Sequence, residues 1–400
     1  MTEHLEAVTE IRQLGALGDR LVRGGIIAGA VGLAASGGLA ATMGVDRFLF
    51  AYVLNLAFFL SLALGGLFLV VLHHLTRTGW GVVVRRLAEA VASTLPFLAL
   101  LFLPVLLGVH HLYHWADPAV VAKDPLLQAK GAFLNVPFFA LRWALYFGVW
   151  ILTARFFVGR SIAQDATGDV ELTSRMQGAA APATLAFALT TTFAAIDLLL
   201  SLDAHWYSTI FGVYFFAGCV VAIVSLLILL AFGAQQAGLL RSSITVEHYH
   251  DLGKYLFAFV VFWAYIAFSQ YMLIWYANLP EETGWFLRRQ THGWGGVGLA
   301  LLFGHFVLPF LALLSRAPKR QPPLLAAAAA WMLAMHWIDL YWLVMPEASG
   351  LSPRLHAVDL TLFVGIGGFV VAGAAWTLRG RFLVPVRDPR LEESRHFENA

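Results

Sequence analysis

The chain has 400 residues, of which 60% are hydrophobic and 12% are charged, and its formal net charge is +2. This composition is typical of a polytopic α-helical membrane protein, and the small net charge argues against a nucleic-acid-binding protein. The single cysteine, Cys219, excludes a disulfide framework and a cysteine-ligated iron–sulfur cluster within the chain.

Ten apolar segments are long enough to cross a bilayer, so we predict an all-α fold with ten transmembrane helices in one membrane domain, residues 1–400. In chain order the segments are 24–43, 48–72, 87–109, 132–158, 183–202, 210–232, 255–277, 295–314, 324–345 and 357–378. Pro96 and Pro104 lie in the third segment, Pro137 in the fourth and Pro309 in the eighth. We expect each proline to kink its helix and free a backbone carbonyl.

The distribution of Lys and Arg predicts the orientation of the chain. Residues 1–23 mix acidic residues with arginines, unlike a signal peptide, so we expect an uncleaved first helix. The side that carries both termini holds 19 of the 26 Lys and Arg residues, the other side holds 6, and Arg142 lies within the fourth segment. The positive-inside rule then places both termini in the cytoplasm.

The seventh segment, residues 255–277, is the one around which we expect the other helices to be arranged. It holds 23 residues without a formal charge, which as a helix span roughly 35 Å. Gln270 shares a face with Trp263, Ile266 and Ile274. A polar amide in hydrocarbon needs a partner, so this face should meet other helices. We interpret Gln270 first as a group that joins helices, and keep it among the candidate proton-transfer residues.

The loops opposite the termini collect histidines, aromatic residues and acids. They are residues 110–118, 203–207, 279–289 and 346–350. An interfacial aromatic belt explains the Trp and Tyr content, whereas the His and acidic residues fit either a docked partner or ordinary solvated loops. Three histidines within residues 110–114 leave a metal site open as an alternative. Haem is not expected, because no segment holds two deep histidines.

Asp197 in the fifth segment is the clearest charged residue at membrane depth, where ionisable groups are costly. Thr190 and Ser201 are spaced to share its face, and Asp203 and His205 continue the polar character to the outer end. This pattern fits a stripe that passes protons. The alternative is a structural ion pair between Asp197 and Arg142.

The ninth segment carries a second candidate pair, His336 and Asp339, which are three residues apart and therefore on one helix face. An imidazole beside a carboxylate can relay a proton or bind a quinol hydroxyl. His305 in the eighth segment stands alone, and we interpret it as a packing residue.

Residues 245–254 form the entrance to the seventh segment on the side of the termini. Glu247, His248, His250, Asp251 and Lys254 would give this entrance a hydrated, titratable character. An ordinary solvated loop is the alternative. Together with the deeper candidates, this entrance outlines two polar zones on opposite sides of an apolar middle.

The middle of the chain resembles a known family. The matching stretches begin SLDAHWY, SSITVEHYH and MLAMHWIDLYW and cover residues 201–218, 242–283 and 332–347, with weaker similarity at 106–118 and 134–147. They resemble the F subunit of alternative complex III, a bacterial quinol:electron-acceptor oxidoreductase. That subunit is similar to the NrfD-like membrane subunits of polysulfide reductase.

The resemblance implies two four-helix bundles, about 46–205 and 208–346, plus two peripheral helices, in a bacterial inner membrane. It implies partners in a related membrane subunit, an iron–sulfur subunit and cytochrome c subunits, besides the lipid bilayer. No covalently bound cofactor is expected, whereas a quinone such as menaquinone is compatible. The implied half-channels would be lined by Asp197, Asp203, His205, His336 and Asp339 outward and by His248, His250 and Asp251 inward.

The leading hypothesis is therefore a metal-free membrane subunit of a quinol-oxidising respiratory complex that contributes proton-transfer groups. One alternative is a secondary transporter, although no matching pair of interrupted half-helices is evident. Another is an inert scaffold whose deep polar groups only join helices.

Overall fold

The computed structural model describes residues 13–349 and 352–399, and this part of the chain is all-α, as predicted. It contains ten helices long and apolar enough to span a membrane. They are α2 (Ala16–Met43), α3 (Val45–Leu75), the α4–α6 run Val82–Leu107, α10 (Val136–Thr167), α11 with η2 (Glu171–Leu202), α12 (Phe211–Gln236), α13 (Val246–Ala277), α15–α16 (Trp294–Leu314), α18 (Pro322–Ser349) and α19 (Ala357–Leu378). The described residues form no β-strand, only an isolated bridge between Gln13 and Phe382.

Two of the ten spans are interrupted where prolines were expected to act. The third divides into α4 (Val82–Ala92), α5 (Leu95–Leu101) and α6 (Leu103–Leu107), and Pro96 and Pro104 lie in the first turns of α5 and α6. The eighth runs from α15 (Trp294–Leu301) through a π-helical turn, η3 (Leu302–Val307), to α16 (Leu308–Leu314), where Pro309 lies in the first turn. Proline cannot donate the backbone hydrogen bond that would continue the preceding turn.

Two further expectations, a kink at Pro137 and the start of the fifth helix, are wrong. Pro137 does not kink α10, because it stands in the first turn, where the missing N–H is not needed and Asn135 caps the helix. The fifth helix, α11 (Glu171–Leu198), begins twelve residues before the expected start at residue 183 and contains Pro182. Its polar first turns lowered the hydropathy of a stretch that is nevertheless helical.

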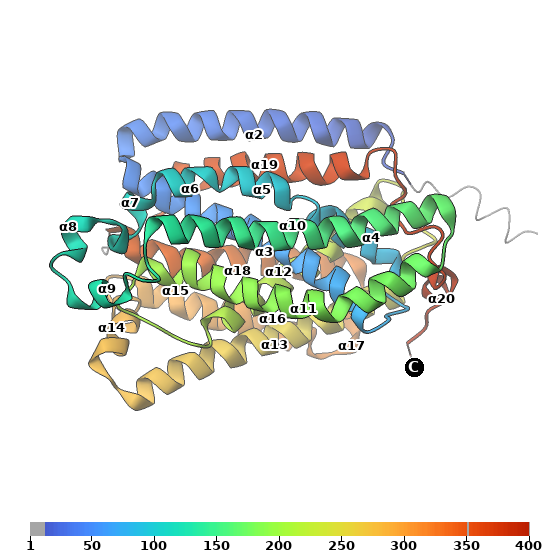
Figure 1. Cartoon of the computed structure of the whole chain (residues 1–400). Coiled ribbons are helices and arrows are strands. Elements are labelled where there is room, and N and C mark those ends of the chain that lie inside the picture. Colours follow the sequence, from blue (N-terminus) through green and yellow to red (C-terminus); the bar gives the residue numbers. More distant parts are fainter. Residues whose placement is uncertain (1–12, 350–351, 400) are drawn as a thin grey trace, which may run out of the picture.

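The central helix is α3, not the seventh span. Helix α3 contacts α4, α10, α11, α12, α18 and α19, and its buried residues run from Leu49 to His74. In α13 only a stripe that includes Trp263, Ile266, Gln270 and Ile274 is buried across the middle of the helix. The predicted buried face of this span is confirmed, but the helix lies at the edge of the molecule (Figure 1).

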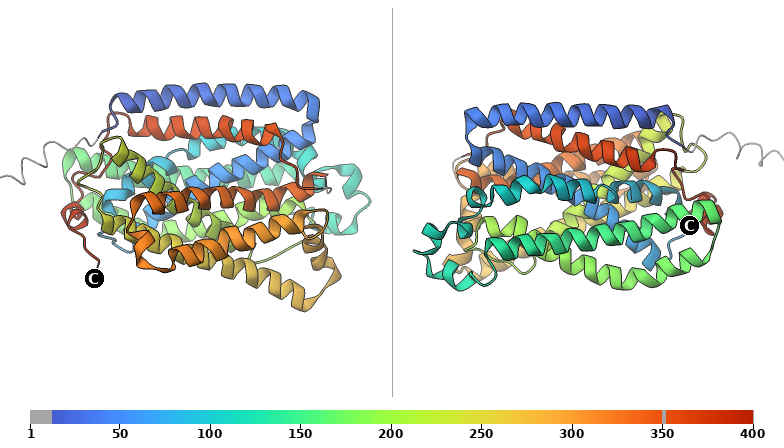
Figure 2. Two further views of the ribbon diagram at one scale, coloured as in Figure 1. Left: turned by 180° about the vertical axis from the view of Figure 1, so that it is seen from behind. Right: turned by 45° about the horizontal axis from the view of Figure 1, so that its top comes forward.

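The remaining helices pack around α3 in two groups and one outlying pair. Helices α4, α5, α10 and α11 pack with one another and with α3, while α12, α13, α16 and α18 form the other group, and α3 also contacts α12 and α18. The division into bundles at 46–205 and 208–346 remains a prediction. Helices α2 and α19 lie side by side along one edge (Figures 1 and 2). A Cβ on Gly32 would lie 2.5 Å from the amide nitrogen of Gly365, so glycine is required for this close backbone contact.

Short helices lie at the two ends of the molecule. One end, here named the terminal end, carries α17 (Arg316–Lys319), α20 (Leu391–Arg395) and the C-terminal segment 379–399 (Figure 1). The opposite end carries α7 (Val109–Leu112), η1 (His114–Ala116), α8 (Pro118–Val121), α9 (Pro125–Lys130) and α14 (Pro280–Arg288).

Candidate functional site

Asp197 near the end of α11 is held by an ion pair, the second of the two alternatives that the sequence left open. Arg142 Nε donates to Asp197 Oδ2 at 2.7 Å and Arg142 Nη2 donates to Oδ1 at 2.8 Å. Tyr146 donates its hydroxyl to Oδ2 at 2.9 Å. The guanidinium also donates to the Phe133 carbonyl and stacks on its ring at 3.8 Å. Asp197 is fully buried, and both of its oxygens are occupied.

The two hydroxyls expected on the Asp197 face do not reach its carboxylate. Thr190 accepts a hydrogen bond from Trp150 Nε1 at 2.8 Å, and Ser201 donates to the backbone carbonyl of Asp197 at 2.6 Å. The polar groups of α11 are therefore individually bonded and do not form one continuous row.

Asp339 in α18 is the buried carboxylate with the most unusual surroundings. Tyr214 of α12 donates its hydroxyl to Oδ1, and Trp263 of α13 donates Nε1 to Oδ2 at 3.2 Å. Only 1% of Asp339 is exposed, and no Lys or Arg of the described chain forms an ion pair with it. The two partners of Asp339 are neutral donors, and no cation fixes its charge. The net charge of this buried site therefore changes when the carboxyl binds or releases a proton.

His336 lies one turn away but is not hydrogen-bonded to Asp339. Its Nε2 lies 2.9 Å from the hydroxyl oxygen of Ser61 in α3, while Nδ1 has no hydrogen-bond partner in the described part of the chain. Residues three apart on a helix diverge by about 60° around its axis, so the two side chains reach different neighbours. The expected direct His336–Asp339 contact is absent from these described residues.

His305 belongs to this region, although the sequence suggested only a packing role. It lies in the π-helical turn η3, its ring centroid is 3.8 Å from that of Trp263, and it is fully buried. Neither ring nitrogen has a hydrogen-bond partner among the described residues. π-Helical turns are often found at functional sites, which was a signal not visible in the sequence. We name Ser61, Tyr214, Trp263, His305, His336 and Asp339 the central cluster.

At the opposite end, Asp203 and His205 are tied to neighbouring elements. His205 Nε2 lies 2.6 Å from Asp124 Oδ2, and Arg288 of α14 forms an ion pair with Asp203. Gln270 accepts a hydrogen bond from Ser208 at 2.8 Å, which provides the partner that its burial requires. The hydrogen bond from His205 is the main cause that lowers the pKa of Asp124 below its ordinary value, and the backbone N–H groups of Leu126 and Leu127 act in the same direction.

We expect the α9 turn to loosen in acid. A carboxyl with a lowered pKa in the folded state stabilises that state above its unfolded pKa of about 4, and this contribution is lost as the pH falls through the folded value. The hydrogen-exchange protection factors of the Leu126 and Leu127 amides should therefore decrease between about pH 7 and about pH 3. In Asp124→Asn, whose amide oxygen can still accept from these N–H groups, protection should not depend on the ionisation of residue 124 and should stay the same at both pH values. Equal protection of wild type at both pH values would contradict this expectation.

Three of the five residues named at the entrance 245–254 are buried, whereas Lys254 is exposed and Glu247 is partly exposed. His248 is fully buried, its Nδ1 takes part in the capping box with Thr245 and its Nε2 lies 2.9 Å from the Ser394 carbonyl. His250 is 8% exposed and Asp251, which pairs with Lys254, is 5% exposed. The C-terminal segment 379–399 packs over this region, a long-range contact that local sequence could not indicate.

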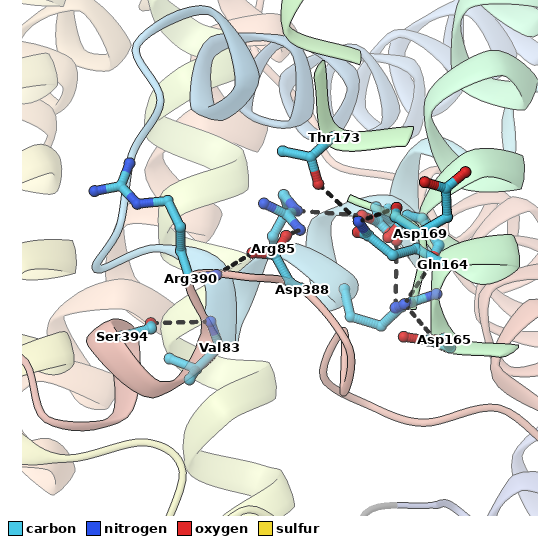
Figure 3. Close-up of polar contacts among 12 residues, drawn as sticks. Val83, Arg85, Gln164, Asp165, Asp169, Thr173, Asp388, Arg390 and Ser394 are labelled. Atoms are coloured by element: carbon cyan, nitrogen blue, oxygen red, sulfur yellow. Dashed lines mark hydrogen bonds and ion pairs between the residues drawn. The ribbon is translucent and has the colours of Figure 1, made fainter. Parts of the chain in front are cut away.

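A further ionic group at the terminal end was missed by the sequence analysis. Arg85, Arg86 and Glu89 lie on α4 and are all buried. Arg85 pairs with Asp388 of the C-terminal segment (Figure 3). Arg86 pairs with Asp165 of α10. Glu89, a single acid within the apolar segment 87–109 and close to Arg85 and Arg86, was a signal available in the sequence.

The histidines at residues 110–114 do not converge on a metal. His110 Nδ1 lies 2.7 Å from the Ala116 carbonyl, and His111 Nδ1 lies 2.8 Å from Asp46 Oδ1. Within the described residues there is no group of three His, Cys, Asp or Glu side chains that could hold a metal ion.

An apolar layer separates the central cluster from the buried ionisable groups at the terminal end, while Arg289 and Asp359 are buried toward the opposite end. Along α3, Ser61 of the central cluster and His73 at the terminal end are twelve residues apart, about 18 Å in a helix. The eleven residues between them are Leu, Ala, Gly, Phe or Val. Comparison with known proteins finds no protein-family model and no curated protein that matches this chain.

Proposed function

We propose that this polytopic membrane protein is a proton-transferring subunit of a quinol-oxidising respiratory complex of the alternative complex III type. The observation that supports proton transfer is the pairing of two buried ionisable zones with an apolar layer of about 18 Å between them. Ionisable side chains at membrane depth are costly, so their presence at two depths indicates a role. In this proposal each zone serves as a half-channel that exchanges protons with one side of the membrane.

Asp339 is the residue on which the proposal depends most. Asp197 carries a fixed countercharge in Arg142, whereas Asp339 is bonded to a phenol and an indole only. A buried carboxyl without a fixed countercharge can change protonation state in response to its surroundings. We assign Asp339 the proton-accepting role and Tyr214 and Trp263 the role of positioning its carboxylate.

The respiratory setting is supported by the resemblance at residues 201–218, 242–283 and 332–347. Under this proposal the chain lies in a bacterial inner membrane with both termini in the cytoplasm. Its partners are a related membrane subunit, an iron–sulfur subunit and cytochrome c subunits. At the opposite end Arg288 of α14 pairs with Asp203 and with Glu347 of α18, and the outer subunits would dock at this end of the molecule.

The groove between α2, α3, α18 and α19 does not fit a complete quinone site. Its volume is about 930 Å³, and its walls include Phe58, Phe59, Trp337 and Phe363. These apolar walls suit an isoprenoid or acyl chain. The indole N–H of Trp337 is already donated to Asn55, and the described lining offers no pair of polar groups for the two quinol oxygens. We therefore assign no redox step to this chain.

The proposal is tested with Asp339→Asn in the assembled complex reconstituted in vesicles. We expect quinol oxidation to continue while proton uptake per electron decreases several-fold, because the amide cannot accept the proton. Asp197→Asn should also impair coupling, and Glu171→Gln, at an exposed carboxylate of α11, should not. Co-purification of the partner subunits with normal haem absorption checks assembly. Unchanged coupling in Asp339→Asn, or solute uptake by the purified chain alone, would contradict the proposal.

A further inference from the structure

The ionic group at the terminal end is a closed cluster formed by three separate parts of the chain. Arg85 Nη2 lies 2.5 Å from Asp388 Oδ2, and Arg86 Nη2 lies 2.6 Å from Asp165 Oδ2. Glu89 lies between the two arginines, 3.5 Å from Arg85 Nε and 3.3 Å from Arg86 Nε. Figure 3 shows Arg85 beside Asp388 and Asp165 on the neighbouring helix. We name these five residues the Glu89 cluster.

The Glu89 cluster is removed from solvent. The side chain of Glu89 is 0% exposed, and those of Arg85 and Arg86 are 4% and 2% exposed. Neither carboxylate oxygen of Glu89 has a hydrogen-bond partner in the described part of the chain, and Arg86 Nε and Nη1 have none either. Ion pairs in such surroundings stabilise a protein only when their charges balance and their hydrogen bonds are satisfied.

The charges of the cluster do not balance. It contains three carboxyl groups, on Glu89, Asp165 and Asp388, and two guanidiniums. Each aspartate has one arginine at hydrogen-bonding distance. Glu89 therefore has no arginine of its own and lies beside two guanidiniums that already pair with the aspartates. Ionisation of all three carboxyls would leave one uncompensated negative charge in a buried site, and one bound proton removes it.

The neighbouring groups do not supply the missing positive charge. His73 and His74 of α3 are buried, and neither forms an ion pair with a carboxylate of the Glu89 cluster in the described part of the chain. Arg390 forms an ion pair with Glu393 and interacts with Asp388 more weakly. Arg387 is exposed and donates to the Ala166 carbonyl, not to a carboxylate of the cluster. Gln164 of α10 and Thr173 of α11 are neutral and bonded to each other.

We propose that the Glu89 cluster binds one exchangeable proton, shared among its three carboxyl groups, at the terminal end of the membrane domain. Glu89 lies seven residues after the start of α4, about 10 Å along the helix. As the terminal-side half-channel, the cluster would take the place of the entrance expected at His248, His250 and Asp251. This last role rests on the proposed function, whereas the binding of the proton does not.

The proposal is tested by pH-resolved infrared spectroscopy of the purified full-length chain in lipid nanodiscs. The wild type should show a protonated-carboxyl C=O band at neutral pH that shifts in deuterium oxide. This band should be lost in Glu89→Gln and retained in Glu171→Gln, an exposed control. Asp339→Asn separates any contribution from the central cluster. Absence of the band in wild type, or its persistence in Glu89→Gln, would overturn the proposal.

A folding measurement provides an independent test. Glu89→Gln leaves two carboxylates and two guanidiniums, so the folded fraction should equal or exceed that of wild type at high pH. Arg86→Gln leaves three carboxyls around one guanidinium, and most of the folded protein should be lost as the pH rises. Equal loss in both variants would contradict the charge argument. Both tests use the chain without partners and address only proton binding by the Glu89 cluster. The Asp339→Asn experiment in the complex addresses only the proposed function, so either proposal can fail without the other.

Discussion

Replacing Arg142 by glutamine should lower the free energy of unfolding by about 3–5 kcal/mol, the range found when one partner of a buried ion pair is removed. Asp197 is fully buried and receives three hydrogen bonds, two of them from Arg142. Without the guanidinium, the carboxylate keeps only the Tyr146 hydroxyl. Thermal unfolding can be followed by the reaction of a thiol dye with Cys219, which is fully buried in the folded chain.

The double variant Arg142→Gln/Asp197→Asn is the matched control. It removes both charges together, so most of the stability should return, as expected for residues that act as a pair. If the double variant were as unstable as Arg142→Gln, the loss would come from packing against Phe133 and Phe138 and not from the unpaired charge.

Replacing Gly65 by alanine should destabilise the contact between α3 and α12. A Cβ at this position would lie 2.4 Å from the carbonyl oxygen of Cys219 and 2.7 Å from Cγ2 of Ile223. Because the nearest atom is backbone, the two helices must separate, and overpacking of this kind typically costs about 1–3 kcal/mol. Denaturation followed by circular dichroism measures this loss without relying on Cys219.

Gly148→Ala in α10 is the control for the helical effect of alanine. No atom lies within 4 Å of a Cβ built at this position. The substitution should therefore be neutral or stabilising by up to about 1 kcal/mol, since alanine favours the helix over glycine. If both variants were equally stable, the proposed close contact at Gly65 would be wrong.

Hydropathy was sufficient to predict ten membrane-length helices because each span must satisfy its own backbone hydrogen bonds in hydrocarbon. It failed at the start of α11, where Glu171 and Arg175 belong to a helix that extends beyond the apolar segment. It also failed to identify the central helix. The aromatic-rich α13 and the more aliphatic α3 are both apolar, and only tertiary packing shows that α3 is surrounded.

The cost of burying charge explains which site residues the sequence could indicate. Asp197 and Asp339 stood out as single acids in apolar segments, and Arg142 could be considered as a partner because it is also isolated. Tyr214 and His305 gave no comparable signal, since their importance depends on which groups face them. Glu89 was visible as a charge in an apolar span, but Asp165 and Asp388, which pair with the arginines beside it, lie far away in sequence.

The C-terminal segment also has a consequence for biosynthesis. Asp388 follows α19, the last membrane-length helix in the described chain, yet it neutralises Arg85 at the start of the third span. During translation, Asp388 is synthesised after all the described spans, so Arg85 cannot form this ion pair until they have been made. A nascent chain arrested directly after α19 would therefore contain all ten helices but would lack the buried ion pair between Arg85 and Asp388.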